Sequence, residues 1–188
     1  MCFADHPKKI MKRSLVLILL FVLTISSCYA QTKKVTGHII TGADQTDLYL
    51  PYLKGKRIGM VVNQTSIIGK TTSVESLHNL GVNIVKVFGP EHGFRGNASA
   101  GVHVDDEVDA KTGIKVLSLY GKTSKPSKES LSDIDLMIFD IQDVGARFYT
   151  YTITLHRIME ACAENNVELM ILDRPNPNGY LIDGPILD

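Results

Sequence analysis

The sequence has 188 residues, of which 44% are hydrophobic and 21% are charged, and its 20 basic and 20 acidic residues leave no net charge at pH 7. These values are typical of a globular chain with a buried core and exclude a mainly disordered one. Because no basic run lies outside the N-terminus, nothing in the charge pattern supports nucleic-acid binding.

The N-terminal segment predicts a secretory leader. From Met11, the expected start, the sequence reads MKRSLVLILLFVLTISSCYAQ, a basic pair followed by an apolar run that is short for a membrane span. Two processing sites fit: a lipobox ending at Cys28, which would give a lipidated and membrane-anchored N-terminus, and simple cleavage after Ala30. We therefore expect an exported protein, with residues 1–30 as extension and signal peptide and residues 31–50 as a linker or edge element.

Five apolar segments predict the strands of a sheet within residues 51–188. They are rich in valine and isoleucine and cover residues 57–63, 82–88, 114–120, 136–141 and 167–173. Helices are expected at 71–80 and, ending near Asn165, on the stripe that includes Leu155, Ile158 and Cys162. Cys162 is expected to be a small buried hydrophobe. Continuously apolar strands that alternate with helices predict an α/β, Rossmann-like, mostly parallel sheet with helices on both faces.

Polar or ionisable residues follow each predicted strand. In an open parallel sheet, ligands bind beyond the carboxyl ends of the strands, so these residues predict a site at that edge. In chain order they are Asn63, Glu91, His92, Tyr120, Asp140, Gln142, Asp143, Arg147, Asp173, Arg174 and Asn176.

Two kinds of site find little support in the motifs. The turn NQTSIIGK after the first strand contains neither G-x-G-x-x-G nor a P-loop, which disfavours a nucleotide. His92, His103, Asp105, Asp140 and Asp143 are plausible metal ligands, but the sequence has no H-E-x-x-H and no cysteine cluster. We therefore expect no cofactor and no metal, with a metal-dependent hydrolase kept as an alternative.

Carboxylate chemistry is the third possibility. Glu91 lies in GPEHGFRG between apolar Phe88 and Phe94, surroundings in which a carboxylic acid can act as a general acid at neutral pH. A glycosidase usually needs a second carboxylate, for which Asp143 and Asp173 are candidates. Arginines suit a substrate that carries its own carboxylate. The structural alternatives are that Asp140 and Asp173 cap turns, that Arg147 pairs with Asp143, and that Tyr149 and Tyr151 are wall or packing residues.

Four motifs, GPEHGFRG, DAKTGIKVLSLYG, FDIQDVGARFYTYT and LDRPNPNGYLIDGPILD, together resemble the exo-β-N-acetylmuramidase family of NamZ type over about residues 57–188. The resemblance implies a bacterial cell-envelope glycosidase, periplasmic or lipid-anchored. Its substrates would be peptidoglycan fragments such as MurNAc-GlcNAc, from whose non-reducing end it would remove N-acetylmuramic acid during wall turnover or recycling. Family members are about twice as long and carry a β-rich C-terminal domain across the cleft. We therefore expect an N-terminal part that lacks full activity alone.

The resemblance also implies roles for the polar residues. Glu91 is the leading catalytic candidate, with His92 orienting it and Asp143 as a possible partner. Arg95, Arg147 or Arg174 would hold the lactyl carboxylate, and the acetamido group of the substrate could replace the second carboxylate. Retaining, inverting and substrate-assisted mechanisms stay open, as does a non-catalytic muropeptide-binding lipoprotein. The expected substrate-binding residues are Asn63, Arg95, Gln142, Arg147, Tyr149, Asp173, Arg174 and Asn176.

Overall fold

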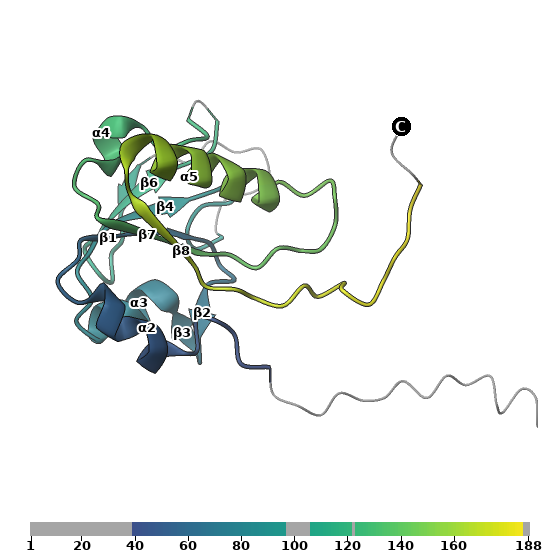
Figure 1. Cartoon of the computed structure of the whole chain (residues 1–188), viewed down its shortest axis with the longest axis horizontal. Coiled ribbons are helices and arrows are strands. Elements are labelled where there is room, and N and C mark those ends of the chain that lie inside the picture. Colours follow the sequence, from purple (N-terminus) through teal and green to yellow (C-terminus); the bar gives the residue numbers. More distant parts are fainter. Residues whose placement is uncertain (1–38, 97–105, 122, 186–188) are drawn as a thin grey trace, which may run out of the picture. The chain divides into compact units, whose positions relative to one another are not determined.

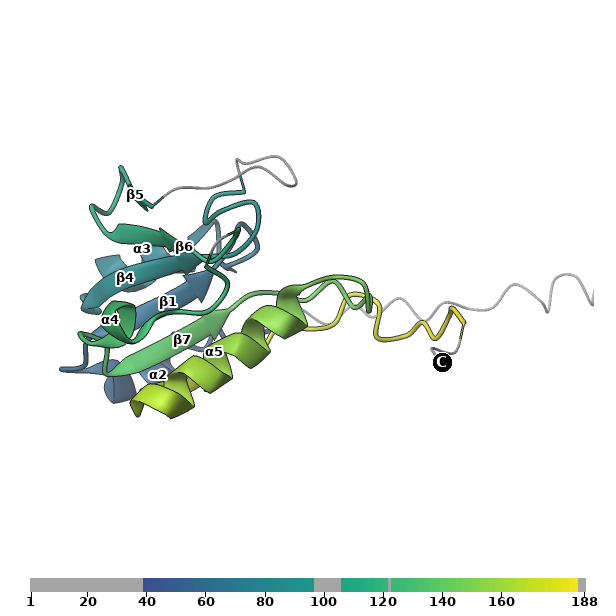
Figure 2. The same ribbon diagram turned by 90° about the horizontal axis from the view of Figure 1, so that it is seen from above.

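A six-stranded sheet with helices on both faces is the framework of the computed structural model, which describes residues 39–96, 106–121 and 123–185 (Figures 1 and 2). These residues belong to one compact unit, Ile39–Asp188. The predicted leader, with both lipobox and cleavage sites, lies outside the described residues, as do His103 and Asp105.

The strand order is β5-β6-β4-β1-β7-β8, and every neighbouring pair is parallel except the edge pair β5–β6. All five predicted strands are confirmed, and the short β5 is an addition. The bounds are β1 Ile58–Val62, β4 Ile84–Gly89, β5 Glu107–Val108, β6 Lys115–Ser118, β7 Leu136–Asp140 and β8 Glu168–Ile171. A separate hairpin joins β2, Ile67–Ile68, to β3, Thr71–Thr72.

The central strands are apolar throughout because both of their faces are covered. Alternate residues of a strand point to opposite faces. On β1, Met60 and Val62 pack in the core layer that α2 and α3 cover, whereas Val61 packs in the layer that α4 and α5 cover. Residues of β7 divide in the same way. The predicted parallel sheet with helices on both faces is confirmed.

Four helices in the described part of the chain provide that cover. They are α2 Thr46–Leu53, α3 Ser73–Asn79, α4 Lys128–Leu131 and α5 Tyr151–Asn165. The predicted helix at 71–80 begins only at Ser73, because Thr72 is its N-cap and accepts a hydrogen bond from the Glu75 N–H (3.2 Å). Cys162 on α5 is buried as expected, and burial raises the pKa of its thiol to about 11.

The expectation of a linker or edge element is wrong for residues 46–50, which belong to α2. Tyr49 and Leu53, four residues apart, lie on one side of this helix and are buried against the sheet. Pro51 within the helix and the polar residues before it hide this pattern in the sequence. Upstream of α2, the Gly42 N–H donates to the carbonyl of Asp173 (2.8 Å), which ties this segment to the end of β8.

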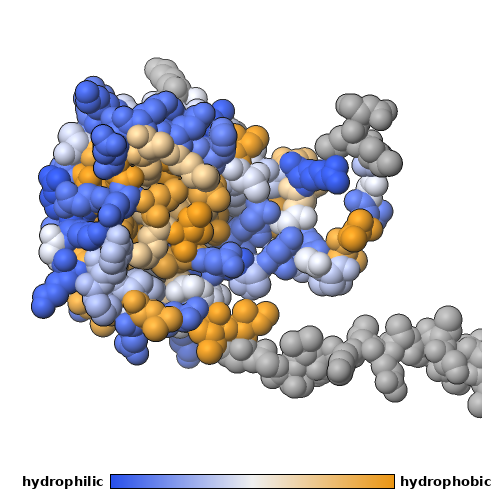
Figure 3. Space-filling view, in the orientation of Figure 1, coloured by the Kyte–Doolittle hydropathy of each residue, from blue (hydrophilic) through white to orange (hydrophobic). Residues whose placement is uncertain are grey.

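The outer edge of β8 is open within the described residues. Ile171 is 49% exposed, and Figure 3 shows an apolar area between α5 and α2 at this edge of the sheet. No helix in the described part of the chain is both long and apolar enough to cross a membrane.

Candidate active site

The loop after β4 presents Glu91 and His92 at the carboxyl end of the sheet. The Gly93 N–H donates to the carbonyl of Pro90 (2.9 Å), and His92, at the third position of this turn, has a φ of 71°. Glycine or asparagine usually occupies such a position, since a left-handed backbone costs other residues on the order of 1–3 kcal/mol. Phe94, 1% exposed, anchors the loop in the core and holds the strained turn.

Glu91 and His92 line a cavity of about 220 Å³ together with Phe148, Tyr149, Thr150 and Tyr151 from the start of α5. The rings of Tyr149 and Tyr151 are tilted against each other, with centroids 5.5 Å apart. The structure therefore brings together three of the predicted site residues, Glu91, His92 and Tyr149. A carboxyl group beside aromatic walls in a cavity of this size suits general acid chemistry on a small polar ligand.

Two tyrosines for which the sequence predicted no catalytic or substrate-binding role lie near Glu91. A hydrogen bond to Glu91 raises the pKa of Tyr120, which follows β6. Burial raises the pKa of Tyr151, and the nearby charges of Tyr149 and Glu91 act in the same direction. Tyr120 does stand at a predicted strand end. No pattern in the sequence marks Tyr151 as a site residue. Its ring is buried like that of a core residue, and the sequence alone does not distinguish the two roles.

Asn63, at the end of β1, is fully buried beside Tyr151. Its Oδ1 accepts hydrogen bonds from the N–H and the hydroxyl of Thr65 (2.9 and 2.6 Å), so the amide nitrogen must point the other way. The side chains of Asn63 and Gln64 both lie close enough to the phenol of Tyr151 to lower its pKa. Asn63 therefore lies buried near Tyr151, a residue of the cavity wall, and does not itself line the cavity that holds Glu91.

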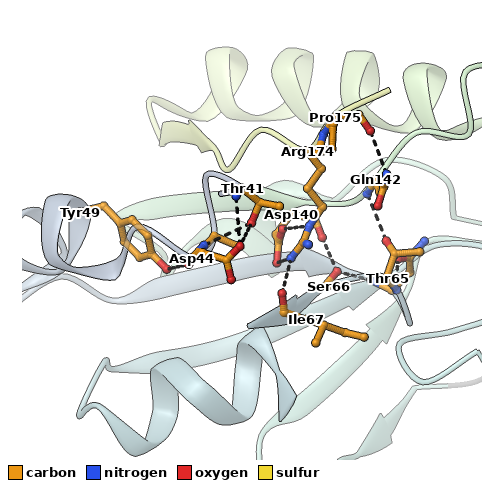
Figure 4. A network of polar contacts seen from close by, with 12 residues as sticks. Thr41, Asp44, Tyr49, Thr65, Ser66, Ile67, Asp140, Gln142, Arg174 and Pro175 are labelled. Carbon is orange, nitrogen blue, oxygen red and sulfur yellow. Dashed lines mark hydrogen bonds and ion pairs between the residues drawn. The ribbon is translucent and has the colours of Figure 1, made fainter. Parts of the chain in front are cut away.

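Arg174 has a structural position. Its guanidinium binds Asp140 through two parallel contacts, Nε–Oδ1 at 2.6 Å and Nη2–Oδ2 at 3.1 Å, and also donates to the carbonyl of Ile67 at 3.0 Å (Figure 4). The side chains of Arg174 and Asp140 are 6% and 0% exposed. The ion pair thus joins the ends of β7 and β8 to the hairpin β2–β3 instead of facing the cavity.

Gln142 extends this network. Its backbone N–H donates to the Thr65 hydroxyl (3.1 Å), and its side-chain amide donates to the carbonyl of Pro175 (2.8 Å) (Figure 4). Ser66 also donates to the main-chain carbonyl of Asp140. These contacts hold in place the loop that carries Asn63, so Gln142 acts on the site through the scaffold.

Arg95 is bound to two carboxylates of the protein. It donates to Asp109 Oδ1 through Nε and Nη2 (2.8 and 2.6 Å) and to Glu75 Oε1 through Nη2 (2.9 Å). Burial alone would raise the pKa of both acids. Hydrogen bonds from Arg95 and Lys111 to Glu75, and from Thr112 and Arg95 to Asp109, outweigh this effect, so both pKa values lie below their usual range. Arg95 thereby ties the Glu91 loop to α3.

We expect Arg95→Gln to lower the free energy of unfolding at pH 7 and to lower it less at pH 3. Carboxyl groups whose pKa is lowered in the folded state contribute stability above their unfolded values, near pH 4, and lose it as the pH falls through the folded ones. The wild-type chain should therefore lose more stability on acidification than the variant, measured by urea unfolding at pH 7, 5 and 3. Exposed Lys70→Gln is the control, and a wild-type–variant difference independent of pH would contradict the prediction.

The other predicted residues lie on two turns and near β8. Asp143 Oδ2 accepts a hydrogen bond from the Gly145 N–H (2.8 Å), whereas its Oδ1 is buried and has no hydrogen-bond partner among the described residues. Asn176 Oδ1 similarly accepts from the Asn178 N–H (2.8 Å). Asp173 and Arg147 are both exposed, and Arg147 directly precedes the aromatic wall of the cavity.

Within residues 39–96, 106–121 and 123–185, no three histidine, cysteine or acidic side chains are grouped so that they could hold a metal ion. Of the metal-ligand candidates in the sequence, Asp140 is bound to Arg174.

Comparisons with known proteins give consistent matches. Residues 58–188 match the family model described as "Exo-beta-N-acetylmuramidase NamZ, N-terminal". The chain is 45% identical over 179 residues to the peptidoglycan beta-N-acetylmuramidase NamZ of Bacillus subtilis (strain 168), a match that covers 92% of this chain and 43% of that protein.

Two solved structures of DUF1343 family proteins from Bacteroides fragilis NCTC 9343 are also similar. One has a TM-score of 0.69 at 48% identity and covers 81% of this chain and 39% of that one. The other has a TM-score of 0.68 at 44% identity and covers 78% and 38%. The chain thus spans less than half the length of the relatives it matches.

Proposed function

The chain belongs to the NamZ exo-β-N-acetylmuramidase family, and from this premise we propose that it is the N-terminal part of a peptidoglycan glycosidase. The proposed reaction is release of N-acetylmuramic acid from the non-reducing end of peptidoglycan fragments. The observation that carries the proposal is the position of Glu91, on a strained turn at the sheet edge, in a cavity with His92 and an aromatic wall.

In the proposed reaction, Glu91 protonates the glycosidic oxygen as the bond to the anomeric carbon breaks. His92 orients the Glu91 carboxyl group, and Tyr149 forms a wall of the sugar site. Asp143, whose buried Oδ1 has no partner among the described residues, is one candidate for the second catalytic group. The acetamido oxygen of the substrate is the other candidate, and it would attack the anomeric carbon directly.

Arg147 is the arginine best placed for the lactyl carboxylate of the sugar. Arg95 and Arg174 each bind carboxylates of the protein itself, whereas Arg147 is exposed on the loop that leads into the cavity wall. Asp173 and Asn176 lie near the end of β8 and are proposed to reach only the outer part of the substrate. We also propose that the protein is exported to the bacterial cell envelope, periplasmic or anchored through a lipid on Cys28.

The test is release of free N-acetylmuramic acid from a MurNAc-GlcNAc disaccharide by the protein as its gene encodes it. Release that stops with Glu91→Gln would support the proposal. A folded protein that binds the disaccharide without hydrolysing it would instead be a muropeptide-binding protein. Activity lost in the presence of a chelator and restored by a divalent cation would indicate a metal-dependent hydrolase.

A further inference from the structure

A row of three aromatic side chains runs from the buried part of the cavity to its mouth. Tyr151, Tyr149 and Phe148 all line the cavity that holds Glu91, and they are 5%, 38% and 86% exposed. The rings follow one another closely, since the centroids of Tyr151 and Tyr149 lie 5.5 Å apart and those of Tyr149 and Phe148 lie 6.1 Å apart. The wall is therefore continuous, with Tyr151 in the buried part and Phe148 at the opening.

Phe148 has no place in the core of the described part of the chain. It lies in the loop before α5, which projects beyond the carboxyl edge of the sheet (Figures 1 and 2). Single exposed apolar residues are common on protein surfaces and need no explanation. This ring, however, continues the wall of a cavity beside a candidate general acid, and ligand pockets are lined mainly by apolar and aromatic side chains.

The cavity has room for one sugar ring rather than two. Its volume of about 220 Å³ is below the roughly 300–1,000 Å³ of sites that enclose a drug-sized ligand, and a disaccharide is a ligand of that size. An enzyme that removes the terminal sugar holds that sugar in the enclosed part of its site, with the bond to be broken near the general acid. The second sugar, which leaves, must then lie outside, against the mouth of the cavity.

We propose that Phe148 binds the leaving sugar, an inference that rests on the proposed function of the site. Its ring stacks on an N-acetylglucosamine unit, whose equatorial hydroxyl groups leave C–H groups on the faces of the pyranose. These C–H groups carry a slight positive charge, which the negative face of an aromatic ring attracts. Tyr149 contacts the inner sugar, and Phe148 gives the site a preference for ligands that continue beyond that sugar.

The test measures binding by titration calorimetry to the protein as its gene encodes it, carrying Glu91→Gln so that the ligand is not hydrolysed. The probes are the MurNAc-GlcNAc disaccharide and the methyl β-glycoside of N-acetylmuramic acid, which has the same linkage but no second sugar. Phe148→Ala should weaken binding of the disaccharide about tenfold, the size of a typical aromatic contact, and should leave binding of the methyl glycoside unchanged. Phe148→Tyr, which keeps the ring, should bind both probes as before.

Tyr52→Ala is the matched control. Tyr52 is also an exposed aromatic residue (50%), but it belongs to α2, which covers the opposite face of the sheet from α5, and it does not line the cavity. This substitution should change binding of neither probe. Thermal melting of each variant separates a contact with the sugar from a contact with the protein itself, and we expect Phe148→Ala to leave the melting temperature unchanged.

Each outcome decides the inference. An equal loss for both probes, no loss with Phe148→Ala, or no binding of the disaccharide would overturn it. A lowered melting temperature of Phe148→Ala would also overturn it, because the ring would then pack against the protein. Hydrolysis by the protein that keeps Glu91, without an effect of Phe148→Ala on binding, would retain the glycosidase and reject this site. A selective loss with Phe148→Ala, without hydrolysis by the protein that keeps Glu91, would retain the site and reject the glycosidase.

Discussion

Glu91→Gln is expected to lower the rate of disaccharide hydrolysis by about 10³-fold or more while leaving the fold unchanged. A positioned general acid contributes on the order of 10²–10⁴ to a rate, and glutamine has nearly the shape of glutamate but no proton to give to the leaving oxygen. Glu91 is half-buried and lies in the cavity beside His92, so the substitution alters chemistry at one atom rather than packing.

A substrate that needs no protonation separates a general acid from other roles. A 4-nitrophenyl β-glycoside of N-acetylmuramic acid has a leaving group that departs as a stable anion, so its first step should depend little on Glu91. We expect a much smaller loss of the burst of nitrophenol with this substrate than with the disaccharide. Equal losses would place Glu91 in another role, such as nucleophile. Glu160→Gln, on the exposed side of α5, is the matched control and should change neither rate.

Arg174→Ala is expected to cost about 3–5 kcal/mol of folding free energy, the range for removal of one partner from a buried ion pair. The carboxylate of Asp140 is 0% exposed and would remain in the core without its counter-ion. The Nη2 contact to the carbonyl of Ile67 would be lost as well, which would loosen the hairpin β2–β3. The measurement is urea unfolding at pH 7, followed by circular dichroism.

Two comparison variants make this prediction specific. Arg57→Ala breaks an ion pair with Asp135 of similar length (2.7 Å), but the two side chains are 46% and 40% exposed, so the loss should be far smaller. Replacing both Asp140 and Arg174 by leucine leaves no buried charge and should cost less than Arg174→Ala alone. A cost for Arg174→Ala no greater than that of Arg57→Ala would show that the buried pair does not stabilise the fold.

The parallel sheet and the Glu91 loop could be predicted because their causes are local. Strands such as β1 and β7 are apolar at every position, and a strand of this kind needs cover on both faces. GPEHGFRG follows such a strand directly, so its place at the carboxyl edge follows from the strand itself. Helix α2 was not predicted because its apolar face consists of only a few residues, such as Tyr49 and Leu53, and a proline lies between them.

The sequence by itself determined which residue types stand at the carboxyl edge of the sheet, since each is placed by the strand before it. Only the tertiary structure decided what each side chain binds there. Arg174 meets Asp140, 34 residues away, and Tyr151 meets Asn63 from another element of the fold. Sequence spacing does not encode such encounters, because they depend on strand order and on the packing of α5. For that reason three arginines looked equivalent in the sequence, and burial with internal carboxylates distinguishes Arg95 and Arg174 from Arg147.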